Sequence, residues 1–382
     1  MSALSEIEQG IESVLAESPY AVDSNRRRST VLELLKKEIA YACEQNTAFR
    51  NYVEHWPVNF QGACDISDLP YLPVGVFKTD PLLLVAPEDI KRTLTSSATT
   101  GQIPSRIVLD APTARRMAKG ALTIVRDFIG SARRPYLVID TPENLAAQDQ
   151  IGARGAAIQA LRSFATEIVC GLRSGESGSP ELELDKLVAS AAKWKDQQVL
   201  VYGFTYVIWT QLVLPLQRQG ITLTMPNVHV LHSGGWKRLQ QQSVTRDVFN
   251  QGVSSVFGCS ASRIIDYYGM VENIGVIYPD CEYGNKHVPA FAEVIIRDPL
   301  TLVPVKAGQR GLIQVCSVLP TSFPGFLLLT EDIAEVIGYD NCPCGRRGPS
   351  FRFAGRVPKA EVRGCGNLES TRYKQEQMSG VA

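Results

Sequence analysis

Hydrophobic residues recur along the chain with two different periods. From Val31 to Tyr41 they are spaced three or four residues apart, which predicts an amphipathic helix that packs on one face. After about Leu69 the pattern changes to short apolar runs separated by Gly, Pro and Asp, which predict strands at 135–140, 198–203, 228–234, 292–296 and 312–315. Helices are expected between several of these strands, at 113–129, 155–165, 184–195 and 206–218.

This alternation of strands and helices predicts an α/β core with parallel strands. The chain becomes richer in expected strands after about Asn285. We therefore divide the sequence into a helical N-terminal lead (1–68), a core (69–366) and a polar, flexible tail (367–382).

The composition argues against a nucleic-acid-binding, secreted or membrane-spanning protein. Of the 382 residues, 39 are Lys or Arg and 39 are Asp or Glu, so no basic surplus exists to drive nucleic-acid binding. Early acids and the lack of a cationic start argue against a secretory signal, and the longest apolar stretch, 206–216, is too short for a membrane span. The nine cysteines are scattered and odd in number, which is typical of reduced thiols. We expect a cytoplasmic protein with no membrane span.

A run of hydroxyl-bearing and small residues, Thr95-Ser96-Ser97-Ala98-Thr99-Thr100-Gly101, carries the first candidate chemistry. Small side chains let backbone N–H groups approach an anion and hydroxyls add donors, as a polyphosphate site requires. A flexible surface loop is the alternative interpretation. The spacing of a Walker P-loop is absent.

Five segments in order make the pattern specific. The loop resembles the Ser-Ser-Gly-Thr-Thr-Gly signature of adenylate-forming enzymes, with Ala98 in place of glycine. It is followed by Ser233-Gly234-Gly235, by Tyr268-Gly269-Met270-Val271-Glu272, by Thr330-Glu331-Asp332 and by Gly355-Arg356, each similar to a motif of that superfamily. Each motif alone is weak evidence, whereas their common order is strong evidence.

The closer resemblance is to the LuxE-type acyl-protein synthetases, the synthetase subunit of bacterial fatty-acid reductase complexes. It runs from about Tyr71 to Cys365 and includes His232-Ser233-Gly234-Gly235-Trp236-Lys237 and Arg363-Gly364-Cys365. The resemblance implies the large-domain fold of adenylate-forming enzymes. It also implies ATP-dependent activation of a carboxylic acid, with a fatty acid as the expected substrate. Ala98 and Val271 depart from the family pattern and put nucleotide affinity in doubt.

The resemblance assigns roles to residues of this chain. Residues Ser96, Ser97, Thr99, Thr100 and Gly101 would hold the ATP phosphates, and Glu272 would bind the Mg²⁺ that bridges them. Asp332 and Arg356 resemble the family's ribose clamp. Tyr268, followed by Gly269, would pack on adenine, with Gly234 and Gly235 leaving room for the base. Glu272 could instead be an exposed acid, Asp332 and Arg356 could be surface ion-pair partners, and Tyr268 could be a core aromatic residue.

The chain ends at Ala382, close behind Arg356, so we expect it to lack the mobile C-terminal domain that supplies a lysine in most adenylate-forming enzymes. Lys237 is our leading candidate for the replacement cation, ahead of Arg238 and Lys359. In acyl-protein synthetases the acyl group passes to a cysteine near the C-terminus, and Cys365 occupies that position. Its thiolate would attack the acyl adenylate before transfer to a partner acyl reductase.

Two further groups of residues could have a function. Cys281, His287, Cys342 and Cys344 offer three thiolates and one imidazole, an adequate donor set for a closed structural Zn²⁺ site, although reduced cysteines beside a surface histidine are equally compatible. His229 and His232 lie on one predicted strand and are expected to share a face, with His232 lining the carboxylate pocket. Phe204 is expected to form a pocket wall.

We conclude from the sequence that the chain is an ATP-dependent acyl-protein synthetase. The alternatives are an adenylating enzyme for aryl carboxylates in secondary metabolism, a coenzyme A ligase of the phenylacetate type, and a non-catalytic nucleotide-binding scaffold. The Cys-x-Cys-Gly-Arg element at 342–346 favours the coenzyme A ligase, and the missing domain opposes it.

Overall fold

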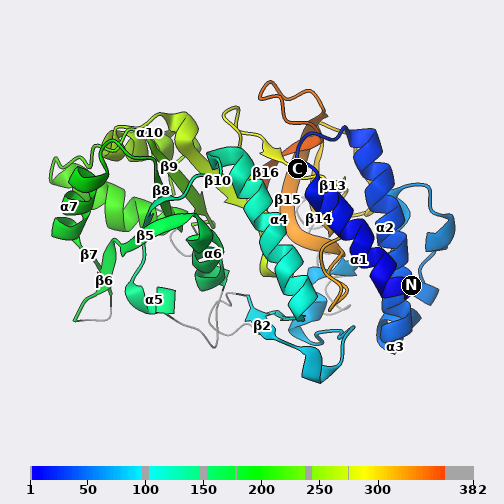
Figure 1. Cartoon of the computed structure of the whole chain (residues 1–382). Coiled ribbons are helices and arrows are strands. Elements are labelled where there is room, and N and C mark those ends of the chain that lie inside the picture. Colours follow the sequence, from blue (N-terminus) through cyan, green and yellow to red (C-terminus); the bar gives the residue numbers. More distant parts are fainter. Residues whose placement is uncertain are drawn as a thin grey trace, which may run out of the picture.

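The computed structural model describes residues 2–96, 103–146, 153–176, 179–236, 243–273 and 275–357. Two sheets dominate the architecture, and they lie in opposite halves of the molecule with helix α4 (Ala111–Ile129) running between them (Figure 1).

The first half contains a parallel sheet of order β11-β10-β9-β8-β4-β5 in which only β11 is antiparallel. Its strands are β4 (Arg134–Val138), β5 (Ala165–Cys170), β8 (Val199–Phe204), β9 (Val228–Ser233), β10 (Ile264–Tyr268) and β11 (Tyr278–Pro279). One face packs on α4 and α6 (Ala153–Leu161). The other packs on α7 (Leu184–Trp194) and α10 (Arg246–Phe257), so helices cover both faces.

The helix that follows β8 is irregular. It consists of α8 (Thr205–Val207), a six-residue π-helix (Ile208–Val213) and α9 (Leu214–Arg218). Wider π turns are frequent at functional sites. Here the π turn buries Trp209 beside Phe249 of α10, with ring centroids 6.0 Å apart.

The second half contains a mainly antiparallel sheet of order β12-β16-β15-β14-β13. Its strands are β12 (Lys286–His287), β13 (Ala292–Arg297), β14 (Arg310–Ser317), β15 (Leu327–Tyr339) and β16 (Pro349–Arg356). The short strand β1 (Leu72–Pro73) joins it by pairing in parallel with β15. Helices α1 (Ala3–Ala16), α2 (Ser24–Gln45) and α3 (Thr47–Glu54) share one hydrophobic core with this sheet.

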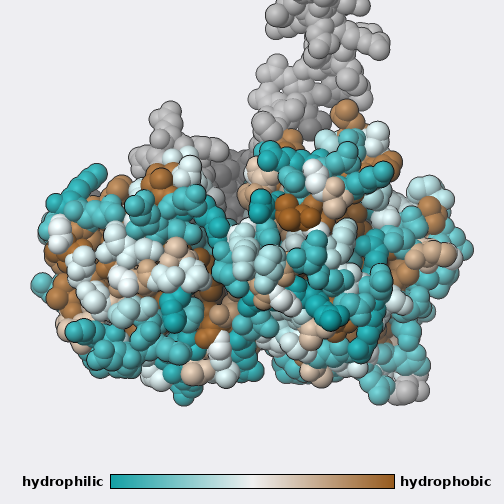
Figure 2. Space-filling view, turned by 90° about the horizontal axis from the view of Figure 1, so that it is seen from above, coloured by the Kyte–Doolittle hydropathy of each residue, from teal (hydrophilic) through white to brown (hydrophobic). Residues whose placement is uncertain are grey.

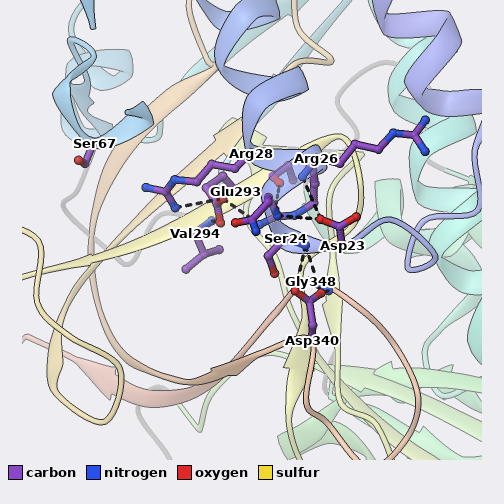
Figure 3. Close-up of polar contacts among 12 residues, drawn as sticks. Asp23, Ser24, Arg26, Arg28, Ser67, Glu293, Val294, Asp340 and Gly348 are labelled. Carbon is purple, nitrogen blue, oxygen red and sulfur yellow. Dashed lines mark hydrogen bonds and ion pairs between the residues drawn. The ribbon is translucent and has the colours of Figure 1, made fainter. Parts of the chain in front are cut away.

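Helix α2 is anchored to this sheet by polar contacts at its first turn (Figure 3). Asp23 caps the helix by accepting hydrogen bonds from the backbone N–H groups of Asn25 and Arg26, which satisfies two otherwise unpaired donors. Asp340 accepts from the backbone N–H of Ser24 at 3.0 Å. The buried Arg27 donates to Glu293 of β13 at 2.8 Å.

The remaining described elements are short. They include two hairpins, β2 (Arg92–Thr95) with β3 (Arg106–Leu109) and β6 (Leu172–Ser174) with β7 (Pro180–Leu182), helix α5 (Pro142–Ala146) and several 3-10 helices such as Val271–Asn273. Hydrophilic residues cover most of the face seen from above, and hydrophobic residues form small separate patches (Figure 2). Among the described helices, none is both long and apolar enough to cross a bilayer.

Candidate active site and metal centre

Two residues, one from each sheet, donate hydrogen bonds to the carboxylate of Asp332. Asp332 of β15 accepts a hydrogen bond from Arg356 Nε at Oδ1 and one from the Tyr268 hydroxyl at Oδ2, each at 2.8 Å. Asp332 and Arg356 face each other in the register of β15 and β16, and Tyr268 ends β10 of the parallel sheet. In Figure 1, β10 ends in the middle of the molecule beside β15 and β16. The structure therefore brings together three residues that the sequence predicts to bind one nucleotide.

The Asp332 carboxylate is buried, but each of its oxygens has used one of two lone pairs, so it can accept two further hydrogen bonds. The Arg356 side chain is 66% exposed and uses its Nε for Asp332, so its other N–H groups can reach a ligand. The hydrogen bond to Asp332 raises the pKa of Arg356. Burial, followed by the Asp332 charge, raises the pKa of Tyr268 well above its usual range, so its hydroxyl remains a donor.

The Tyr268 ring already has aromatic neighbours. It stacks on Phe353 at 5.3 Å and on Tyr278 at 5.9 Å between ring centroids, with an interplanar angle of 27° in both cases. Phe353 of β16 is 42% exposed. A base would thus meet a stack that includes Phe353, a residue that the sequence analysis missed. The alternation of Phe351 and Phe353 just before Arg356 was the available signal.

The expected phosphate loop falls in the chain segment that connects β2 to β3. Ser96 closes this hairpin, because its hydroxyl accepts from the Ser105 backbone N–H at 2.9 Å and its own N–H donates to the Ser105 carbonyl. Strand β3 packs against the 3-10 helix Val271–Asn273, which carries the buried Glu272. The 3-10 helix that carries the predicted Mg²⁺ ligand therefore neighbours the strand that follows the expected loop. Ser97, Thr99, Thr100, Gly101, Lys237 and Cys365 lie outside the described residues.

The Gly-Gly segment directly follows β9. Gly234 has φ +85°, a conformation that favours glycine, and a side chain at this position would point at Phe204 from 3.6 Å. Gly234 and Gly235 are both exposed. This leaves an open strand end next to Phe204, at the carboxyl edge of the parallel sheet where ligands of such sheets bind.

The prediction that His229 and His232 share a face is wrong. Side chains alternate along a strand, so residues three apart point to opposite faces. His229 lies 3.2 Å from the Arg263 guanidinium, and burial together with the charges of Arg263 and Arg134 lowers its pKa to about 4. His232 points the other way, with its Nδ1 2.9 Å from the Thr205 hydroxyl and 3.7 Å from Asp266.

The predicted metal ligands come together. One ligand atom from each of Cys281, His287, Cys342 and Cys344 lies within 4.8 Å of the others. Cys281 and Cys342 sulfurs are 3.8 Å apart, and Cys344 Sγ is 3.3 Å from His287 Nε2. A tetrahedral zinc with Zn–S bonds of about 2.3 Å places two sulfurs about 3.8 Å apart, so this donor set fits zinc. Burial lowers the pKa of His287 to about 4, which keeps the imidazole neutral as coordination requires.

Comparison with solved structures identifies the class of fold. The structure resembles that of 2-hydroxyisobutyryl-CoA ligase in an open conformation with 2-HIB-AMP and CoA, with a TM-score of 0.66, 16% identity and coverage of 89% of this chain and 77% of that chain. The same ligase in its postadenylation state gives a TM-score of 0.67 and 17% identity over 89% of this chain and 70% of that chain. The fold is that of the adenylate-forming enzymes, as the sequence predicts.

The family follows from the sequence comparison. A family model described as acyl-protein synthetase, LuxE, matches residues 1–373, and the chain belongs to this family of ligases. A long-chain-fatty-acid–luciferin-component ligase of Vibrio harveyi is 25% identical over 350 residues, which are 91% of this chain and 89% of the relative. The ligase of the same name from Aliivibrio fischeri is 25% identical over 309 residues, 80% of this chain and 78% of the relative.

Proposed function

We propose that this acyl-protein synthetase uses ATP to convert a long-chain fatty acid into an acyl adenylate. It then carries the acyl group on Cys365 to a partner acyl reductase. The observation that supports the first step is the Asp332 carboxylate at the meeting point of two sheets, held by Tyr268 and Arg356 and able to accept from both ribose hydroxyls. The names of the two bacterial relatives support the choice of fatty acid.

The first step joins two anions. A carboxylate oxygen attacks the α-phosphorus of ATP, and the bond to the bridging oxygen breaks so that pyrophosphate leaves. Asp332 and Arg356 would fix the ribose, while backbone N–H groups of residues 96–101 would bind the phosphates. Lys237 is our candidate for the cation that offsets the charge developing on the phosphoryl group. A bound Mg²⁺, with Glu272 as its protein ligand, would neutralise phosphate charge.

The second step moves the acyl group to sulfur. The Cys365 thiolate attacks the acyl carbon, the carbon–oxygen bond to AMP breaks, and AMP leaves. The thiol proton passes to solvent. A partner reductase would then accept the acyl group from the thioester.

The Cys281, His287, Cys342 and Cys344 cluster is proposed as a structural zinc site. Four protein ligands fill a tetrahedral zinc, which leaves no position for a reacting water. The site therefore supports the fold and takes no part in adenylation.

The test separates the two steps. Hexadecanoic acid should support exchange of labelled pyrophosphate into ATP, and labelled hexadecanoate should remain on the denatured protein. Cys365→Ser should retain exchange and lose the retained label, whereas the control Cys64→Ser, which changes an exposed cysteine, should retain both. Absence of exchange across fatty acids of different length would refute adenylation of this substrate class. Label that persists in Cys365→Ser would refute the acceptor.

A further inference from the structure

A buried charged cluster lies directly beside the candidate nucleotide site. Its centre is Lys286, which is 3% exposed. The Lys286 ammonium is 2.7 Å from Asp266 Oδ2 and 3.0 Å from Asp280 Oδ1. Arg246 lies 3.2 Å from the second oxygen of Asp280. The two acids and two cations of this cluster balance one another.

This balance limits what Lys286 can do chemically. An ammonium has three donors, and those of Lys286 face Asp266 Oδ2, Asp280 Oδ1 and the Asp266 carbonyl at 3.5 Å. The lysine is thus committed to groups of the protein itself. It acts on the reaction only through the elements that it holds.

Those elements belong to different sheets. Asp266 lies on β10 and Asp280 directly follows β11, both in the parallel sheet. Lys286 lies on β12, which pairs with β16 of the other sheet so that Lys286 faces Phe351. The ion pairs of Lys286 therefore join the sheet that carries Tyr268 to the sheet that carries Asp332 and Arg356.

The same strands also carry the nucleotide-site residues. Asp266 and Tyr268 are two residues apart on β10 and share a face, as do Phe351 and Phe353 on β16. Holding Asp266 against β12 fixes the position of β10 relative to β16. That position determines whether the Tyr268 hydroxyl reaches Asp332 and whether its ring stacks on Phe353.

We propose that Lys286 is a positioning residue for nucleotide binding: it joins the two sheets so that Tyr268 and Asp332 meet. The proposal rests on the nucleotide site proposed above and adds a residue that touches neither ATP nor acid. Lys286 acts on ATP binding, because it organises the residues that hold adenosine.

The first experiment measures two dissociation constants by calorimetry, one for ATP with MgCl₂ and one for hexadecanoate. Lys286→Met should raise the dissociation constant for ATP about tenfold and change that for hexadecanoate less than about twofold. The matched control is Arg27→Met, which breaks a comparably buried ion pair, with Glu293 at 2.8 Å, where α2 is anchored to β13. It should lower the melting temperature but leave ATP binding within about twofold of the wild type. Equal effects of the two variants on ATP binding would overturn the proposal.

The second experiment asks whether Lys286 acts through Tyr268. Tyr268→Phe removes the hydroxyl that donates to Asp332. If Lys286 positions that hydroxyl, Lys286→Met should weaken ATP binding much less in the Tyr268→Phe background than in the wild type. Full additivity would refute the positioning role. If Lys286→Met does not fold, the neutral pair Lys286→Met with Asp266→Asn replaces it, with the same two outcomes. A wild-type protein that binds no ATP would instead refute the proposed function.

Discussion

Glu38 is an acid within the core of the helical segment. It lies on α2, is 2% exposed, and neither of its carboxylate oxygens has a hydrogen-bond partner among the described residues. Burial raises its pKa well above the usual range, and the nearby Arg116 offsets only part of this shift. Desolvation disfavours the charged form, so the folded protein holds the proton to a higher pH than the unfolded chain does.

The sign of the pH dependence follows from this difference. Above the ordinary glutamate pKa of 4.5 the unfolded state binds fewer protons than the folded state, so this residue makes stability fall as pH rises. Glu38→Gln should therefore raise the free energy of unfolding at pH 8 by about 1 kcal/mol or more, with a smaller gain at pH 5. Urea denaturation at both pH values measures this.

A matched control lies on the same helix. Glu33 pairs with Lys36 at 3.4 Å and its side chain is 65% exposed. Glu33→Gln should change the free energy of unfolding by less than about 0.5 kcal/mol at either pH. A loss of stability in Glu38→Gln at pH 8 would show that the carboxylate is charged and stabilising in the folded state.

At the scale of elements, helix α4 packs unusually close to the segment after Glu272. Gly275 has φ +95°, and a side-chain carbon there would lie 2.6 Å from the Met117 Cα atom of α4. A backbone atom of a long helix cannot move without shifting the helix, so it cannot make room for a side-chain carbon. The glycine thus allows α4 to pack closely beside the 3-10 helix Val271–Asn273, which carries Glu272 and contacts β3.

We predict that Gly275→Ala lowers the free energy of unfolding by about 2–4 kcal/mol, because backbone strain and steric overlap add. Gly308→Ala is the control. Gly308 has φ +86° but no atom within 4 Å of the added carbon, so only strain of about 1 kcal/mol is expected. Equal losses in the two variants would mean that α4 shifts to accommodate the methyl group.

The sequence predicted part of the element pattern: its five expected strands correspond to β4, β8, β9, β13 and β14, whereas β5, β10, β15 and β16 were not expected. The helix expected at 113–129 is α4 (Ala111–Ile129), and the strand expected at 228–234 is β9 (Val228–Ser233). The apolar period of α4 extends over 19 residues, so the local pattern decides this helix. The π turn at Ile208–Val213 was not predictable, because periodicity distinguishes poorly between helix types and the packing of Trp209 against α10 decides it.

At the scale of the whole molecule, the residues of the proposed nucleotide site come together only where two sheets meet. Motif order predicted Tyr268, Asp332 and Arg356, and the structure joins them through hydrogen bonds of 2.8 Å. The sequence could not reveal Lys286, since nothing in the local pattern shows that Asp266, Asp280 and Lys286 converge. Phe353 was also missed, although its alternation with Phe351 before Arg356 offered a local signal.

The Cys281, His287, Cys342 and Cys344 cluster joins the same two regions of the fold. Cys281 and His287 flank the turn between β11 and β12, whereas Cys342 and Cys344 lie in the turn between β15 and β16. We predict about one zinc per chain by elemental mass spectrometry. Cys344→Ser should lose most of it and lower the melting temperature by roughly 5–10 °C.

The control for the metal prediction is Cys64→Ser, which replaces an exposed cysteine outside the cluster. It should keep its zinc and its melting temperature. Protein that is purified without zinc, stays free of the metal after incubation with zinc chloride, and melts at the same temperature as Cys344→Ser would contradict the assignment.

The pairing of β1 with β15 has a consequence for synthesis of the chain. Leu72 pairs with Leu328 and Pro73 with Leu329, so the two partners are separated by about 250 residues of sequence. At translation rates of roughly 5–20 residues per second, β1 leaves the ribosome about 13–50 s before its partner exists. The parallel sheet can assemble in that interval, since its strands all lie between Arg134 and Pro279. The antiparallel sheet, which packs on α1, α2 and α3, cannot be completed until β15 and β16 emerge. The apolar surfaces of these helices stay accessible to chaperones until then.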